Sequence, residues 1–266
     1  MSFKNPLISI VMSCYNSDKY IADAIKTVKE QNYENWELII VDDCSTDKSL
    51  KIIKKYIEKV EITEKVKIII HDKNFGCGTS LSDAILNSSG ELIAVLDSDD
   101  ALYSKDSLEI MVKIHLENQD ASLVYSNYWE CDENLRKQKI FKTRQIKDDE
   151  TYLGTKIRIS HFKVFKRSLY DKTVGVNREL RQTVDKDLVL KLEEVGKLIH
   201  VNRELYLYRQ RKNNLTKSVG KKDKKYRNFV KIMRYKVYND ARLRRGLKLK
   251  NLEEIEKWEK TQQPVG

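Results

Sequence analysis

The chain has 266 residues, of which 34% are charged and 40% are hydrophobic, and its formal net charge is +11. This length is sufficient for one large domain or two small ones with a buried core. No run approaches the roughly 18 apolar residues of a membrane-spanning helix, and the N-terminal residues lack the pattern of a cleavable leader, so we expect a cytoplasmic protein.

The cysteines do not indicate a metal site. Cys14, Cys44, Cys77 and Cys131 form no Cys-x-x-Cys pair, and no histidine lies at zinc-site spacing from them. We therefore expect reduced thiols.

Apolar, β-branched runs separated by helical patterns organise the first half of the chain. The helical spacing covers residues 20–28 and 50–60. The alternation predicts an α/β protein with a mostly parallel open sheet and helices on both faces. The expected strands are residues 7–12, 36–41, 66–71, 92–96 and 122–128.

Four polar loops follow the first four expected strands, at residues 13–16, 42–47, 72–78 and 97–100. In an open parallel sheet the ligand site lies just beyond the carboxyl ends of the strands. These loops are therefore expected to form one site.

The fourth loop has the sequence DSDD, with one residue between Asp97 and Asp99. Two carboxylates on one side of a strand end repel each other unless a cation lies between them. A hard divalent cation such as Mg²⁺ or Mn²⁺ would balance them. A solvated acidic turn, or an N-cap for a helix after Ser104, is the alternative.

The first two loops contain groups suited to a nucleotide. Asp43 could accept a hydrogen bond from an imide N–H such as that of uracil, and Tyr15 could stack on a base. Thr46 or Asp47 has the simpler role of capping the helix that follows.

These blocks together resemble the family 2 glycosyltransferases, which have the GT-A fold. The matching stretches are ISIVMSCYN, WELIIVDDCSTDKS, NFGCGTSLSDAILNSSGELIAVLDSDDALY and VDKDLVLKLEEVGKLIHVNRELYLYR, within residues 7–216. The resemblance implies transfer of a sugar from a nucleotide diphosphate sugar, with Mn²⁺ or Mg²⁺ as cofactor and inversion at the anomeric carbon.

The resemblance also implies roles for individual residues. Asp185 corresponds to the base that activates the acceptor hydroxyl, and Asp187, two residues later, is the rival candidate. Asp99 corresponds to the metal ligand. Asp97 corresponds to a residue that contacts the metal, a water molecule bound to the metal, or the ribose. The positions expected at the nucleotide sugar are Ser13, Tyr15, Asn16, Asp43, Asp97, Ser98 and Arg211.

Three positions depart from the family pattern. Arg211 stands where the family often has a histidine that helps to hold metal or diphosphate; it cannot ligate a cation but can neutralise phosphate. Leu81 replaces a residue that is basic in many relatives, and Val184 replaces the usual Glu before the base. His161 lies in a strand-like run. It either lines the acceptor site or has a purely structural role, with its polar atoms satisfied within the fold.

The resemblance favours a hexosyl- or N-acetylhexosaminyltransferase that uses a UDP-sugar and acts on a glycan or lipid-linked acceptor in surface polysaccharide or glycoconjugate biosynthesis. Absence of Gln-x-x-Arg-Trp after Tyr208 favours a non-processive enzyme. We expect a catalytic domain at residues 1–218, with a nucleotide-sugar half (1–129) and an acceptor half (130–218). A catalytically silent nucleotide-sugar-binding protein is the alternative.

Positive charge is concentrated in the expected C-terminal extension, residues 219–266. Residues 221–250 contain thirteen Lys or Arg and two Asp, an excess of +11. This equals the formal net charge of the whole chain, so the remaining residues together carry no net charge. Two interpretations are open: the apolar face of a basic helix packs on the domain, or it lies on an anionic membrane. A nucleic-acid binder could also use this segment, but a neutral body argues against it. The apolar stripe comprises Tyr226, Val230, Met233, Val237 and Ala241.

Overall fold

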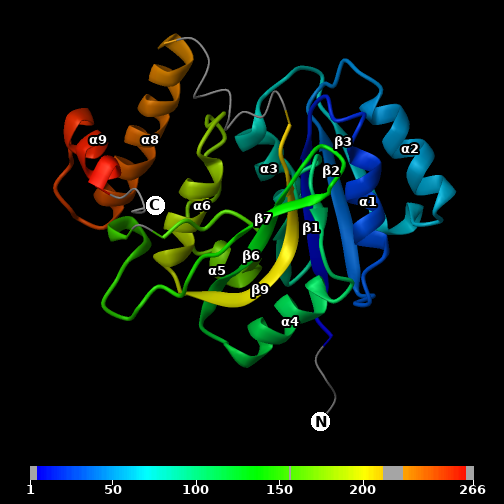
Figure 1. Ribbon diagram of the computed structural model, residues 1–266, viewed down its shortest axis with the longest axis horizontal. Helices are drawn as coiled ribbons and strands as arrows, with labels where there is room; N and C mark the ends of the chain where they lie inside the picture. The colour runs from blue at the N-terminus through cyan, green and yellow to red at the C-terminus, as the bar shows by residue number, and fades with distance from the viewer. Residues whose placement is uncertain (1–4, 156, 212–223, 262–266) are drawn as a thin grey trace.

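The computed structural model describes residues 5–155, 157–211 and 224–261 and has one mixed β-sheet at its centre (Figure 1). The sheet has nine strands in the order β3-β2-β1-β4-β8-β6-β9-β5, and β7 pairs with β6. The α/β prediction is confirmed. The strands are β1 (Ile8–Cys14), β2 (Trp36–Asp42), β3 (Val66–Ile70), β4 (Leu92–Val95), β5 (Ala101–Leu102), β6 (Ala121–Cys131), β7 (Lys137–Phe141), β8 (Lys163–Lys166) and β9 (Lys197–Arg209).

The first four strands of that order are parallel, with β1 between β2 and β4. Each of the five strands expected from the apolar runs is present within a few residues of its expected ends. β8 runs antiparallel to both β4 and β6, and β6 runs parallel to β9. The carboxyl ends of β1, β2, β4, β6 and β9 therefore lie along one edge of the sheet.

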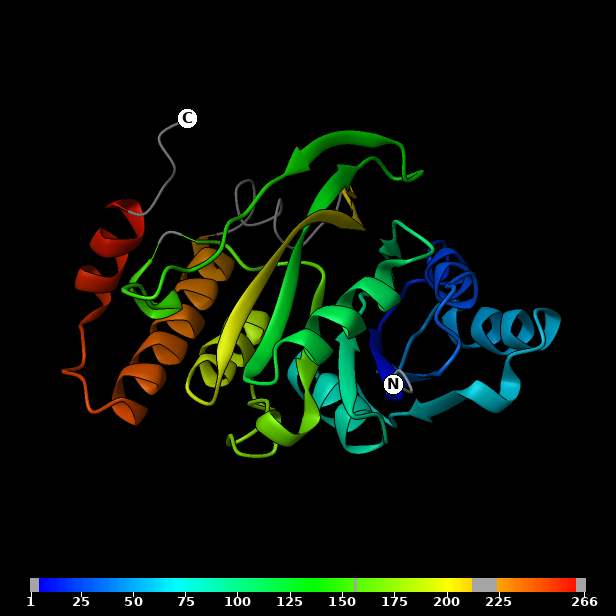
Figure 2. The ribbon, with the colours of Figure 1, turned by 90° about the horizontal axis from the view of Figure 1, so that it is seen from below.

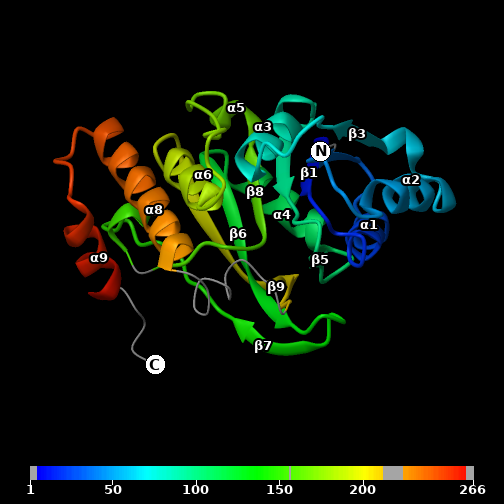
Figure 3. The same cartoon turned by 90° about the horizontal axis from the view of Figure 1, so that it is seen from above.

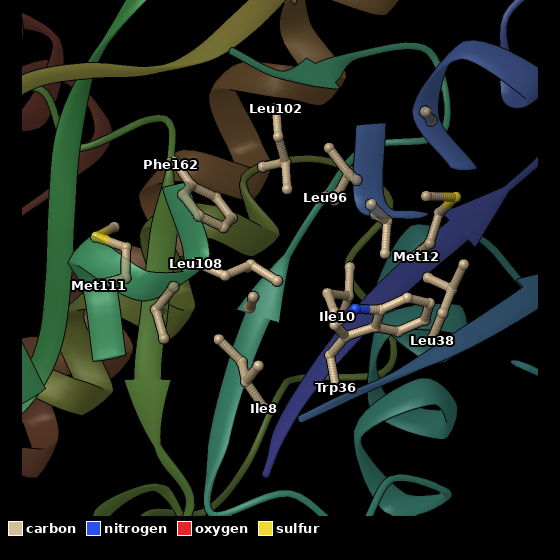
Figure 4. Close-up of a cluster of buried hydrophobic side chains, with 14 of the residues drawn as sticks. Ile8, Ile10, Met12, Trp36, Leu38, Leu96, Leu102, Leu108, Met111 and Phe162 are labelled. Carbon is tan, nitrogen blue, oxygen red and sulfur yellow. The ribbon is translucent and has the colours of Figure 1, made fainter. Parts of the chain in front are cut away.

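Helices cover both faces of the sheet, as expected for strands that are apolar on both sides. One face packs against α1, α2 and α4, and Figure 4 shows part of this core, with Met12, Trp36 and Leu108 among its buried side chains. The other face packs against α3 and α6, with Val11, Ile39 and Leu188 in its core. The helix bounds are α1 (Ile21–Lys29), α2 (Ser49–Lys59), α3 (Cys77–Leu86), α4 (Ser107–Glu117), α5 (Arg167–Tyr170), α6 (Val184–Glu193), α8 (Lys224–Arg244) and α9 (Leu252–Thr261).

The basic C-terminal segment forms α8 and α9, and α8 lies beside α6 (Figure 3). Val230, Val237 and Ala241 are buried, and the last two belong to the core that α6 forms with the sheet. The apolar stripe expected from the sequence thus packs on the domain. Lys221–Asp223 lie outside the described residues. Among the helices that the structure describes, none is long and apolar enough to cross a membrane.

The long strands β6 and β9 extend the sheet past β4 (Figure 2). The chain turns sharply after β4 at residues 97–100, and β5 then pairs antiparallel with β9, placing Ala101 opposite Leu207. This return brings the acidic loop against the carboxyl end of β9, where Tyr206 and Arg209 lie.

Candidate active site

Asp97, Asp100 and His161 form the group best arranged to hold a cation. One ligand atom of each lies within 4.8 Å of the other two, which makes this set a candidate metal site among the described residues. Two ligands on one Mg²⁺ are about 4 Å apart at most, since each bond is about 2.1 Å. The three side chains therefore need only a small inward movement to share one ion.

Burial, and then crowding of carboxylates, governs the electrostatics of this loop. Loss of solvent raises the pKa of Asp97 to about 6, and the charge of Asp99 adds to the rise. The Asp97 side chain is nevertheless exposed to solvent, so water offsets part of this effect. Burial first, and then Asp99 and Asp97, hold the pKa of Asp100 well above its usual range. A divalent cation would relieve this repulsion.

Asp99 is paired with an arginine. Its Oδ2 is 2.6 Å from Nη2 of Arg211, and its backbone oxygen accepts a 2.6 Å hydrogen bond from Nε of Arg209. Burial raises the pKa of Asp99, and Arg211 opposes the rise. Arg211 therefore meets the acidic loop, at the position where the family often has histidine. Metal binding by Asp99 remains a prediction.

His161 is held by aromatic rings. Its imidazole stacks between Tyr206 and Tyr208, with ring centroids 4.7 and 4.9 Å away. Burial, and then the charges of Lys163 and Arg158, hold its pKa well below the usual range, so the ring is neutral. A neutral imidazole fixed in orientation suits a metal ligand better than a surface histidine does.

Asp43 organises the loop after β3. Its carboxylate accepts hydrogen bonds from the backbone N–H of Phe75 and Gly76, at 2.9 and 2.8 Å, and contacts Nδ1 of His71 at 2.8 Å. Asp43 is buried. Its predicted contact with a nucleotide base would have to use a lone pair that these partners leave free.

The loop after β1 lies against the loop after β2. Asn16 accepts a 2.8 Å hydrogen bond from the N–H of Thr46, and Tyr15 is 48% exposed, open to a ligand ring. Ser13, the residue before the last residue of β1, is half-buried, and the Ser98 hydroxyl is 2.8 Å from that of Ser17. Ser98 therefore links the acidic loop to the first loop.

Left-handed backbone conformations occur in three of the site loops. Asn16, Cys44 and Thr183 have φ values of 51°, 60° and 64°. Non-glycine residues in this region store conformational strain, which tends to collect where function requires a particular geometry. Thr183 directly precedes α6, which begins at Val184.

Asp185 and Asp187 lie in the first turn of α6, but in different surroundings. Asp185 is exposed, whereas Asp187 is buried, 2.7 Å from Nζ of Lys191, and accepts the N–H of Asn177. Asp187 therefore has a structural partner. Asp185 has a solvent-facing carboxylate, as its predicted role requires.

Electrostatic effects place Asp185 near the acidic loop. Its charge is among the causes that raise the pKa of Asp97 and of Cys77; burial is the main cause for Cys77, whose pKa rises to about 11. Lys163 on β8 is buried, donates to the Ser160 carbonyl, and lowers the pKa of Asp97. Asp99, Asp185, Lys163 and Arg211 thus all act on Asp97.

Several residues of this region escaped the sequence analysis. The Tyr206 hydroxyl donates to Oδ2 of Asp100 at 2.9 Å and accepts the N–H of Asp97 at 3.1 Å. The buried Arg209 guanidinium donates to Asp23 at 2.8 Å. The alternation in YLYR was the available signal, because it places Tyr206 and Tyr208 on one face of a strand. A cavity of about 320 Å³ beside Leu92 and Lys166 lies at the opposite ends of the strands and is separate from this site.

A family model decides how this geometry is classified. The model described as "Glycosyl transferase family 2" matches residues 9–174, which include the sheet from β1 to β8 and the acidic loop. The chain belongs to glycosyl transferase family 2. The resemblance inferred from the sequence motifs is confirmed.

Curated relatives agree with this membership. The chain is 36% identical over 116 residues to the putative teichuronic acid biosynthesis glycosyltransferase TuaG of Bacillus subtilis, covering 44% of each protein. It is 30% identical over 263 residues to chondroitin synthase of Escherichia coli, covering 96% of this chain and 36% of that one. The chain thus spans less than half the length of either relative.

Solved structures share the fold. The S. aureus TarS 1-349 complex with UDP-GlcNAc has a TM-score of 0.67 at 17% identity, over 88% of this chain and 71% of that one. The Pyrobaculum calidifontis mannosyltransferase PcManGT complex with GDP-Man and Mn²⁺ has a TM-score of 0.66 at 16% identity, over 98% and 70%. At these identities the comparison establishes the GT-A fold.

Proposed function

We propose that this protein transfers a sugar, with inversion, from a UDP-sugar to a hydroxyl of a glycan or lipid-linked acceptor in surface polysaccharide or glycoconjugate biosynthesis. The observation that carries the proposal is the meeting of the acidic loop, Arg211, Lys163 and Asp185 at the carboxyl edge of the sheet. Family membership and relatives named for polysaccharide biosynthesis support it.

The residues present fit a divalent cation. Two carboxylates and a neutral imidazole offer oxygen and nitrogen ligands within 4.8 Å of one another, a donor set suited to Mn²⁺ or Mg²⁺. Asp97, Asp100 and His161 would hold the ion, with Asp99 joining if Arg211 releases it. When bound, the ion would neutralise charge that develops on the diphosphate leaving group.

The chain's own residues supply the rest of the reaction. Asp185 accepts the proton of the acceptor hydroxyl as that oxygen attacks the anomeric carbon. The Arg211 guanidinium, 27% exposed, binds a phosphate oxygen of the donor in exchange for Asp99. Asp43 and Tyr15 hold the base, and Lys163 balances the charge of Asp97.

Two measurements in sequence test the proposal. Isothermal titration with UDP-sugars and Mn²⁺ should show binding that disappears on chelation, and incubation should then release nucleoside diphosphate. Binding without release, across donors and with candidate acceptors, would favour a silent nucleotide-sugar-binding protein. Binding to nucleic acid alone, with affinity falling steeply in salt, would favour the third interpretation.

We propose further that the outer face of α8 contacts an anionic membrane. Phe229, Ile232 and Leu243 are 36%, 44% and 67% exposed, and with Lys236 they lie within about 60° around the helix at ~100° per residue. Asp240 on this face is paired with Arg244. An exposed apolar strip among basic residues is typical of interfacial helices.

Liposome sedimentation tests this membrane contact. The wild type should bind anionic vesicles more strongly than neutral ones and release them in high salt, because each Lys or Arg near the surface contributes ~1 kcal/mol. Ile232→Ser with Leu243→Ser should weaken binding without disturbing the buried face of α8. Equal sedimentation of the wild type with neutral and anionic vesicles would rule the contact out.

A further inference from the structure

His71 lies just after β3, between two carboxylates from different elements. Its Nδ1 is 2.8 Å from Oδ1 of Asp43, and its Nε2 is 3.1 Å from Oδ2 of Asp83 on α3. The His71 ring therefore bridges two carboxylates, one at each of its nitrogens. The Phe75 ring packs edge-on against it at 5.1 Å.

Asp83 extends these contacts toward the segment before α6. Arg178 donates to both oxygens of Asp83, at 2.7 and 3.1 Å, in a bidentate pair. The Arg178 carbonyl accepts a 2.9 Å hydrogen bond from the Thr79 hydroxyl. A planar bidentate pair fixes direction as well as distance. The segment at residues 176–183 is thus attached to α3 by side chains on both partners.

The same segment also docks on the loop after β3, residues 72–78, which contains Gly76 and Gly78. Arg181 donates to the side-chain and backbone oxygens of Asn74, at 3.0 and 3.1 Å. The N–H of Gly78 donates to the Leu180 carbonyl, and a Cβ at Gly78 would lie 2.5 Å from that oxygen. Only glycine permits so close an approach. The loop held by Asp43 and the segment leading to Asp185 therefore form one packed unit.

We infer that His71 is a positioning residue that orients Asp43 for the nucleotide base and, through Asp83 and Arg178, links the base-binding loop to the segment that carries Asp185. The inference rests on the proposed function, since it takes Asp43 as the contact for the base and Asp185 as the catalytic base. It explains why a histidine, rather than an apolar residue, directly follows the edge strand β3. An apolar residue there would leave both carboxylates without their shared donor.

Two isosteric substitutions each remove one of the two contacts of His71, with Asp43 or with Asp83, and keep the other. The amide nitrogen of glutamine falls near the position of Nε2, so His71→Gln keeps the bond to Asp83 and loses the bond to Asp43. The amide nitrogen of asparagine falls near Nδ1, so His71→Asn keeps Asp43 and loses Asp83. His200→Gln is the matched control, because His200 bonds Asn127 on β6, outside this network.

The expected results differ between the variants. His71→Gln should weaken Mn²⁺-dependent UDP binding on the order of 10-fold to 100-fold by isothermal titration, as for loss of a charged hydrogen bond. His71→Asn should keep UDP affinity but lower kcat at saturating donor ~10-fold to ~100-fold, because the segment with Asp185 is displaced. The control should change neither quantity. If His71→Asn does not fold, Asp83→Asn tests the same bond to Asp83 and should give the result expected for His71→Asn.

Failure of this inference is distinguishable from failure of the proposed function. Wild-type UDP affinity and kcat in His71→Gln and His71→Asn would overturn the positioning role while leaving the enzyme assignment intact. A lower melting temperature with unchanged affinity and kcat would overturn it too, since it would show a structural role only. If the wild type binds neither UDP nor GDP with Mn²⁺, the proposed function fails, and the inference fails with it.

Discussion

Asp185→Asn should retain UDP-sugar binding and lose most turnover. Asparagine has nearly the same shape and cannot accept the proton, so kcat should fall ~100-fold to ~10,000-fold, the contribution of a general base. Asp185 is exposed in the first turn of α6, so the change should cost little stability. Titration of the donor together with an assay for released UDP measures both quantities.

Asp187→Asn is the matched comparison, since it alters the neighbouring carboxylate of the same turn. Asp187 is buried with Lys191, and breaking a buried ion pair typically costs ~3–5 kcal/mol. This variant should therefore lower the melting temperature. Near-normal turnover in Asp185→Asn, with a large loss in a well-folded Asp187→Asn, would move the base to Asp187 and contradict our assignment.

Asp97→Ala should abolish the metal dependence of nucleotide binding. Asp97 belongs both to the Asp97–Asp99 pair expected from the sequence and to the group with Asp100 and His161. Substitution of a residue that only supports a metal ligand typically lowers metal affinity ~10- to 100-fold. Loss of a ligand itself should therefore lower metal affinity more than about 100-fold. Titration of UDP with Mn²⁺, and with chelator, measures the effect.

Companion variants identify the other ligands. Asp99→Ala should have a comparable effect if Asp99 leaves Arg211 for the metal, and a smaller one if Asp100 and His161 complete the site. Asp120→Asn is the control, because Asp120 pairs with Lys197 at the start of β9, at the opposite end of that strand from Tyr206 and Arg209. Metal-dependent UDP binding that survives in Asp97→Ala would show that the ion is held elsewhere.

The stability of the metal-free protein should reflect the same crowding. The pKa of Asp97 is raised on folding, so ionised Asp97 destabilises the fold, and the penalty grows as pH rises from its unfolded value toward about 6. Burial and its acidic neighbours act on Asp100 in the same direction. The acidic loop is therefore maintained at a cost in stability, as expected of a functional site.

The strands and the edge that carries the site were predictable because local sequence determines them. Apolar runs such as residues 36–41 are buried wherever the sheet places them, and polar residues directly after parallel strands must share one edge. These inferences needed no knowledge of which strands are neighbours.

The partners of the acidic loop were not predictable in this way. Tyr206 and Arg209 contact residues more than 100 positions earlier, through the pairing of β5 with β9. The resulting ion pair of Asp99 with Arg211 follows from that topology and not from motif spacing. His71 gave no signal either, because its two carboxylate partners meet only when α3 packs on β1 and β2.

The most direct measurement is a crystal structure of the wild type with Mn²⁺ and UDP, with the ion located by anomalous scattering. We expect a manganese peak within bonding distance of Asp97, with the diphosphate on its open side and Arg211 turned toward phosphate. UDP bound without manganese at this loop, or manganese only at a distant site, would contradict the assignment of the acidic loop to the donor.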